Sequence, residues 1–227
     1  MKDVLHLLES QRDAERRFVA EAASERDFPH GWPAGLLMAH IASWREKLRA
    51  SLIEASRGQP ASPPPIDINA FNAAELARNA GVALGEAAAR ADALLVDLID
   101  LWATLGDRPF SWLTAKTSGE ALVRNSYIHP RVHLAEHYLE RGDRMRGQEI
   151  FEETAGELRR AETPAHILAP AIYKLAGARV AQGRQDEALE LLAEAFVMRD
   201  ELRSEAAKDP DLALLKTHPR FQALIIG

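Results

Sequence analysis

Apolar residues recur every three or four positions through most of this chain, and that spacing places them along one face of an α-helix. Residues 3–25 show the pattern among many charged residues, which predicts an amphipathic helix with a solvated outer face. The segment FPHGWP, residues 28–33, breaks it, and a second helix is predicted from there to about Ser56. Its buried stripe is expected to contain Leu37, His40, Ile41, Trp44 and Leu48. A titratable residue, His40, thus lies in the middle of an apolar face.

The middle of the chain alternates between helix-breaking and helix-forming segments. Residues 58–65, GQPASPPP, cannot form a helix and predict a stiff extended connection. The alanine-rich residues 66–105 predict one long helix, and residues 106–111 predict a turn. A fourth helix is predicted over residues 119–141, where Pro130 either starts the ordered helix as an N1 proline or kinks it. Four helices with mostly short links favour an antiparallel bundle.

An internal repeat begins before the fourth predicted helix ends. Leu134-Ala135 and Gly142 recur 41 residues later as Leu175-Ala176 and Gly183, and each copy predicts a helix, a glycine turn and a second helix. In the second copy, small residues stand where two helices can cross closely. These are Ala176, Ala188 and Ala195. The repeat indicates a further helical region after the bundle.

The composition agrees with a helical protein and excludes several functions. Of 227 residues, 47% are hydrophobic and 27% are charged, and few are β-branched, which favours an all-α fold. The net charge of -6 comes without a dense basic patch, so no nucleic-acid partner is expected. The chain has no cysteine, which excludes disulfides, a cysteine nucleophile and a thiolate metal site. Any thiol chemistry would need a low-molecular-weight thiol as co-substrate.

The sequence gives no indication of a membrane segment. The N-terminal stretch MKDVLHLLESQRDAERR is charged throughout and lacks the apolar core of a signal peptide. No apolar run approaches the roughly 20 residues that a helix needs to span a bilayer. We therefore expect a cytoplasmic protein that has no membrane partner.

The candidate chemistry lies in the segment NSYIHPRVHLAEHY, residues 125–138, which places His129, His133 and His137 four residues apart. In a helix, successive members of this series lie about 40° apart on one face, so two imidazoles can reach one metal ion. His40 is the best candidate for a further ligand. Three neutral imidazoles with open positions suit Zn²⁺, Ni²⁺ or Fe²⁺. Alternatively, His40 is an ordinary core histidine and the series is a solvated polar face.

Aromatic residues near these histidines are candidates for the wall of a substrate pocket. They are Trp32, Trp44 and Tyr127. Aromatic residues at helical spacing also form ordinary core packing, which is the alternative for all three. No glycine-rich phosphate loop, Ser-His-Asp arrangement or EF-hand loop is present in the sequence.

Residues 1–141 resemble the DinB-like four-helix bundle superfamily, and particularly its ClbS/DfsB-like branch. The resemblance lies in Trp32, in residues 40–45 (HIASWR), in residues 67–72 at the start of the third helix and in residues 125–133. It implies a four-helix bundle of DinB type with a divalent-metal site at one end. Members of the superfamily include thiol-dependent transferases and isomerases that use bacillithiol or mycothiol, and a toxin-resistance hydrolase. Some members keep the bundle without a functional metal, and homodimers are common, so we expect a homodimer.

The resemblance also implies which histidines hold the metal. One comes from the second helix, matching His40, and a pair spaced HxxxH comes from the last helix of the bundle. The motif of the branch fits His129 with His133, whereas helix geometry beyond Pro130 fits His133 with His137. Both pairs remain open at the level of the sequence.

Residues 142–227 resemble the tetratricopeptide repeat family, with a capping ending at residues 209–221. Arg179 departs from the pattern, because that family usually has an aromatic residue there. Two or fewer repeats are marginally stable alone, so the resemblance implies a helical extension packed on the bundle. Repeats of this kind also suggest a protein partner.

Two functions follow from these features. The first is a metal-dependent hydrolase or thiol-dependent transferase that acts on a small electrophilic molecule, with water or a low-molecular-weight thiol as the nucleophile. The alternative is a non-catalytic adaptor or assembly protein that uses an exposed apolar groove in the repeat-like helices. A bundle that has lost its metal and kept a pocket is a third interpretation.

Overall fold

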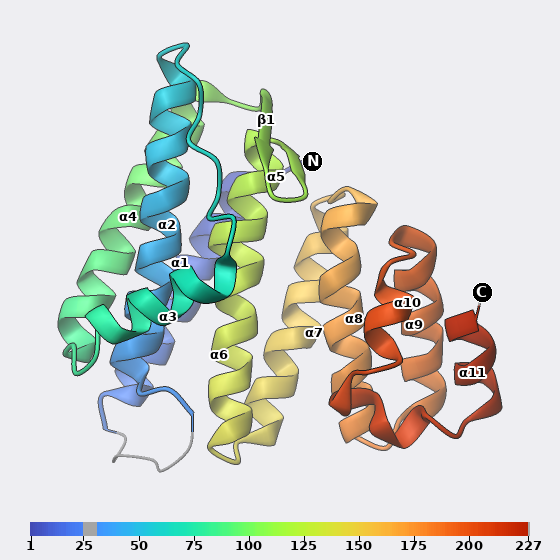
Figure 1. The fold of residues 1–227 in the computed structure, drawn as a ribbon. Coiled ribbons are helices and arrows are strands. Elements are labelled where there is room, and N and C mark those ends of the chain that lie inside the picture. Colours follow the sequence, from blue (N-terminus) through green and yellow to red (C-terminus); the bar gives the residue numbers. More distant parts are fainter. Residues whose placement is uncertain (25–30, 227) are drawn as a thin grey trace. The chain divides into compact units, whose positions relative to one another are not determined.

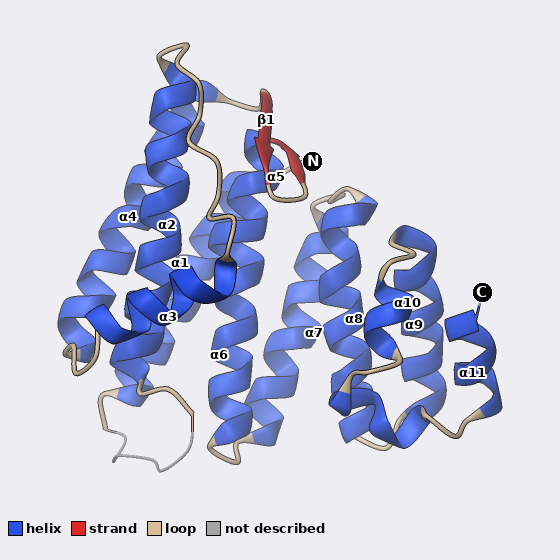
Figure 2. Ribbon diagram, in the orientation of Figure 1, coloured by secondary structure: helices blue, strands red, loops and turns tan. Residues whose placement is uncertain are grey.

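The computed structural model describes residues 1–24 and 31–226, and most of them are helical (Figures 1 and 2). This confirms the predicted all-α class. The chain divides into two compact units, Met1–Gly147 and Gln148–Gly227, which we call the N-terminal unit and the C-terminal unit. None of the helices formed by the described residues is both long and apolar enough to cross a membrane.

The helices of the N-terminal unit pack against one another around an apolar core (Figure 1). Their bounds are α1 Val4–Ala22, α2 Ala34–Ser56, α3 Ile68–Arg78, α4 Leu84–Leu105, α5 Ser118–Val123, the π-helical turn η1 Arg124–Ile128 and α6 His129–Glu140. The predicted buried stripe on α2 is confirmed, because each of its residues is at most 6% exposed. Pro33 is the N-cap residue of α2, and residues 28–30 of the predicted break lie outside the described residues.

The region predicted as one long helix forms two helices, so that prediction was wrong. α3 ends at Arg78 and α4 begins at Leu84, and between them Gly81 has a left-handed φ of 77°. A residue in that conformation cannot continue an α-helix, and glycine adopts it without steric strain. α3 then crosses α2 as a separate element (Figure 1). It is capped by Asp67, whose side chain accepts a hydrogen bond of 2.9 Å from the backbone N–H of Ala70.

A short β-hairpin follows α4, where the sequence predicted a turn at residues 106–111 (Figure 2). β1 (Pro109–Trp112) pairs antiparallel with β2 (Ala115–Thr117). Phe110 and Trp112 alternate with exposed residues and are 5% and 1% exposed. Strands this short carry too few alternations to be detected from the sequence, which is why the hairpin was not predicted.

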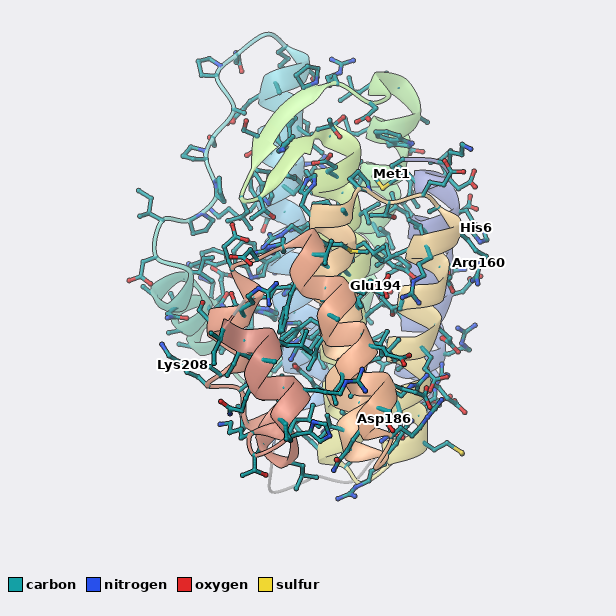
Figure 3. The ribbon with its side chains drawn as sticks, turned by 90° about the vertical axis from the view of Figure 1, so that its right-hand side faces the viewer. Met1, His6, Arg160, Asp186, Glu194 and Lys208 are labelled. Carbon is teal, nitrogen blue, oxygen red and sulfur yellow. The ribbon has the colours of Figure 1, made fainter. Side chains whose placement is uncertain are left out.

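The C-terminal unit is also helical. Its elements are α7 Arg144–Arg160, which begins shortly before the unit, α8 Ala165–Ala181, α9 Gln185–Met198, α10 Leu202–Ala206, the 3₁₀ turn η2 Pro210–Leu215 and α11 Pro219–Ile226. α8 and α9 pack side by side across a turn in which Gly183 has a φ of 76° (Figure 1). The alanines predicted at a close helix crossing are fully buried. On the outer side of α9, where Figure 3 labels Asp186 and Glu194, Glu194 pairs with Arg159 at 2.5 Å.

Candidate metal centre

Three of the predicted metal ligands converge in the N-terminal unit. Nε2 of His129 lies 3.1 Å from Nε2 of His40 and 3.0 Å from Nε2 of His133. One ligand atom from each of these residues lies within 4.8 Å of the others. Two imidazole nitrogens bound to one metal ion at about 2.1 Å are roughly 3.0–3.4 Å apart, so the two distances from His129 suit such an ion. We call these three residues the histidine trio.

Two helices contribute the trio. His40 belongs to the buried stripe of α2, whereas His129 and His133 are one helical turn apart on α6. His40 is 3% exposed, and the other two are half-buried. Trp32 lies edge-on to His40 with ring centroids 5.0 Å apart and stacks on His133 at 5.6 Å. The indole therefore holds rings from both helices in place.

Pro130 lies within a continuous helix, directly after His129 and three residues before His133. Proline has no N–H to donate to the carbonyl of Ser126, four residues earlier, and its ring crowds that carbonyl. The helix widens in η1, where the N–H of His129 donates to the carbonyl of Arg124, five residues earlier. The predicted fourth helix is thus present as the continuous series α5, η1 and α6, and Pro130 stands in the first turn of α6, directly after the wide turn.

Burial keeps two members of the trio neutral. It lowers the pKa of His40 to about 3, with a further contribution from His133. Burial also lowers the pKa of His129 well below its usual value, and His133 and His40 lower it further. A neutral imidazole has a free lone pair on one nitrogen, which is the form that binds a metal ion. These rings are therefore in their metal-binding form at neutral pH.

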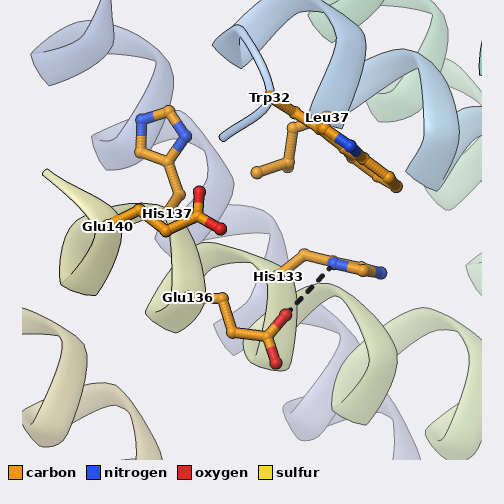
Figure 4. Close-up of a pocket in the computed structure, with 6 residues that line it drawn as sticks. All are labelled: Trp32, Leu37, His133, Glu136, His137 and Glu140. Atoms are coloured by element: carbon orange, nitrogen blue, oxygen red, sulfur yellow. Dashed lines mark ion pairs between the residues drawn. The ribbon is translucent and has the colours of Figure 1, made fainter. Parts of the chain in front are cut away.

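The Nδ1 atoms on the other side of the rings have different surroundings. Oε2 of Glu136 lies 3.7 Å from Nδ1 of His133 (Figure 4), which is too long for a hydrogen bond but close enough to favour a proton on that nitrogen. Nδ1 of His40 is buried and has no hydrogen-bond partner among the described residues. On this side, the ring of His40 is held by its packing against Trp32.

His137 does not join the trio. Its ring packs edge-on against Phe18 with centroids 4.7 Å apart, and the residue is 2% exposed. Of the two HxxxH pairs that the sequence left open, the structure brings His129 and His133 to His40.

The three predicted pocket aromatics have different positions. Trp32 lines a pocket, as described below, whereas Trp44 lies 6.1 Å from the ring of His129 and donates a hydrogen bond of 3.0 Å to the side chain of Asn72. Tyr127 is fully buried, and its ring lies 5.1 Å from the guanidinium carbon of Arg131. Trp44 and Tyr127 are therefore packed in the core of the N-terminal unit.

A pocket of about 240 Å³ adjoins the trio (Figure 4). Its lining consists of Trp32, Leu37, His133, Glu136, His137 and Glu140. His133 belongs both to the trio and to the pocket wall, so a molecule in the pocket would lie beside the candidate metal position. In Figure 4 the aromatic ring of Trp32 faces His133, and the carboxylate of Glu140 lies beside His137. The wall thus combines an apolar side with two carboxylates.

Arg45 is a fully buried residue that contacts the wide turn, and it was not among the predicted site residues. It lies four residues after Ile41, on the same stripe of α2, so its burial was visible in the spacing.

Comparisons of the chain with protein-family models, with curated proteins and with solved structures found no match. Any function assigned to the chain therefore rests on the residues of the site.

Proposed function

We propose that the N-terminal unit is a DinB-like bundle in which His40, His129 and His133 hold one divalent metal ion. The observation that carries the proposal is the convergence of three Nε2 atoms from α2 and α6, at spacings that suit one ion. The lowered pKa values of His40 and His129 support it, because neutral rings accept a metal ion without first losing a proton.

The metal would be Zn²⁺, Ni²⁺ or Fe²⁺, since imidazole ligands suit all three and the trio leaves coordination positions open. Such an ion supplies a Lewis acid and lowers the pKa of a coordinated water or thiol. His133 and Trp32 would orient a small electrophilic molecule in the adjoining pocket. At about 240 Å³ the pocket is smaller than the roughly 300–1,000 Å³ of typical ligand sites, which favours a small substrate.

The reaction would be hydrolysis or thiol transfer. Because the chain has no cysteine, a thiol nucleophile would come from a low-molecular-weight co-substrate. For the C-terminal unit we propose a fold like that of tetratricopeptide repeats. The support is the paired helices α8 and α9, the left-handed turn at Gly183 and the buried alanines between the two helices.

The experiment is metal binding by purified, metal-stripped protein, measured by calorimetry and elemental analysis. We expect one Zn²⁺ per chain, and we expect His40→Ala, His129→Ala and His133→Ala each to weaken binding by about 100-fold or more, which corresponds to about 2.7 kcal/mol. His137→Ala should retain binding, because that ring packs on Phe18 outside the trio.

The matched control is His6→Ala, which removes an exposed histidine from α1. This variant should bind Zn²⁺ with the same affinity as the unaltered protein. Circular dichroism of each variant establishes that it is folded. Unchanged Zn²⁺ affinity in the three trio variants would remove the proposal.

A further inference from the structure

A buried ion pair crosses the core of the N-terminal unit. Arg45 on α2 is 0% exposed, and Glu15 on α1 is 4% exposed. Their side chains form two hydrogen bonds, of 2.9 Å and 2.5 Å. Transfer of both charges from water carries a large desolvation penalty, and apolar residues of similar volume often stabilise a protein equally well or better. The contribution of this pair to stability therefore does not explain its presence.

Arg45 also binds the wide turn. Its guanidinium donates to the backbone carbonyls of Ser126, at 3.3 Å, and of Ala91, at 3.1 Å. The carbonyl of Ser126 is the one that Pro130 cannot bond, because proline has no N–H. Arg45 thus offers this carbonyl a donor in place of the N–H that proline lacks, three residues before His129.

A second set of hydrogen bonds connects α6, beyond the wide turn, to α1. Arg131, 1% exposed, donates through Nε to Gln11 at 2.8 Å and through its terminal nitrogen to Ser10 at 2.8 Å. Gln11 in turn donates to Glu15 at 2.7 Å, which links this set to the ion pair. Arg131 lies between the two trio residues of α6 in sequence, so both sides of the wide turn are tied to α1.

We infer that Gln11, Glu15, Arg45 and Arg131 are positioning residues for the metal ligands. They hold the wide turn open and fix the rotation of α6, so that its imidazoles face His40. One residue more or fewer in a helical turn rotates everything beyond it by about 100°, which would turn the imidazoles away. This role rests on the proposed metal site, and it identifies the residues that set the rotation of α6 relative to His40.

The decisive variant is Glu15→Leu/Arg45→Met, which replaces the ion pair by apolar chains. We expect it to be folded, because apolar chains of similar volume often replace a buried ion pair without loss of the fold. Its Zn²⁺ affinity should nevertheless fall about 10- to 100-fold. The visible absorption of bound Co²⁺, which reports the number and geometry of the ligands, should change as well. If these residues served the fold alone, a variant that still folds would keep its Zn²⁺ affinity and its Co²⁺ spectrum.

Glu15→Gln should have the opposite effect, lowering the stability while leaving the Zn²⁺ affinity unchanged. It keeps acceptor and donor atoms near Arg45 but leaves that charge buried without its counter-charge, so stability should fall. Because the geometry is retained, Zn²⁺ affinity at 25 °C and the Co²⁺ spectrum should stay close to those of the unaltered protein. The control is Arg12→Met/Asp92→Leu, which removes a partly exposed ion pair between α1 and α4 and should leave both metal readouts unchanged.

Metal binding by the unaltered protein is measured first, and its absence would overturn the proposed function together with this inference. Given binding, the inference alone fails in two cases. One is a Glu15→Leu/Arg45→Met variant that keeps the original Zn²⁺ affinity and Co²⁺ spectrum. The other is a variant that does not fold, because the ion pair would then be a requirement of the fold itself.

Discussion

At the scale of single residues, the trio makes the metal-free protein sensitive to acid. The pKa of His40 is lowered to about 3 in the folded chain, whereas in the unfolded chain it titrates near its usual value of about 6.5. The unfolded chain therefore takes up a proton that the folded chain does not, and the free energy of unfolding decreases as the pH falls below about 6.5. For each of the two histidines with a lowered pKa, His40 and His129, we expect a decrease of up to about 1.4 kcal/mol per pH unit between about pH 6.5 and 5, measured by urea unfolding with a chelator present.

His40→Leu is the matched variant for this effect, because an apolar chain has no proton to take up. Its free energy of unfolding should depend less on pH than that of the unaltered protein. His6→Ala, at an exposed position, should follow the unaltered protein. An identical pH dependence in the unaltered protein and in His40→Leu would show that the buried imidazole is not the source.

Local spacing was enough to single out His40 and the series of His129, His133 and His137 as candidate ligands. The apolar stripe placed His40 inside the fold, and the four-residue spacing placed His129 and His133 on one face. The choice between the two HxxxH pairs needed the direction of α6 after the wide turn. Pro130 signals a disturbed helix but not its form, because Arg45, which donates to the carbonyl of Ser126 in the turn, is distant in sequence.

At the scale of elements, the wide turn η1 is the feature on which the proposed metal site would depend. Pro130→Ala restores a backbone N–H, so the carbonyl of Ser126 can be bonded inside an ordinary α-helical turn. The turn would then narrow and rotate His129 relative to the preceding helix. We expect a thermal midpoint at least as high as before, because alanine is a better helix former than proline by about 3 kcal/mol. Zn²⁺ affinity, measured by calorimetry, should fall about 10-fold or more.

The comparison for this variant is Pro63→Ala, in the extended connection after α2, which changes a proline without touching a helix. It should leave Zn²⁺ affinity unchanged. Equal or tighter Zn²⁺ binding by Pro130→Ala would show that the trio does not need the wide turn.

Helical periodicity predicted which segments are helical better than it predicted where they end. The interruption at Gly81 is a backbone conformation, and the alanine-rich residues around it continue the helical pattern without a break. The hairpin at Phe110 and Trp112 was missed because its strands are too short for a period to appear. The buried stripe of α2 was correct, since it extends over several turns.

At the scale of the whole molecule, the proposed site lies within one unit. The trio and the pocket residues belong to Met1–Gly147. All four tryptophans of the chain are also in this unit, at positions 32, 44, 102 and 112. Tryptophan fluorescence therefore reports the unfolding of the N-terminal unit, whereas circular dichroism reports the helices of both units. The two signals together can assign a bound ion to one unit.

We expect Zn²⁺ to raise the thermal midpoint seen by tryptophan fluorescence, because a ligand that binds the folded state adds about 2.7 kcal/mol at 100 times its Kd. His133→Ala should show no such shift. Part of the transition seen by circular dichroism should stay at its metal-free temperature, because the C-terminal unit contains no member of the trio. A shift seen by circular dichroism and absent from fluorescence would assign the ion to the C-terminal unit, which contradicts its binding by His40, His129 and His133.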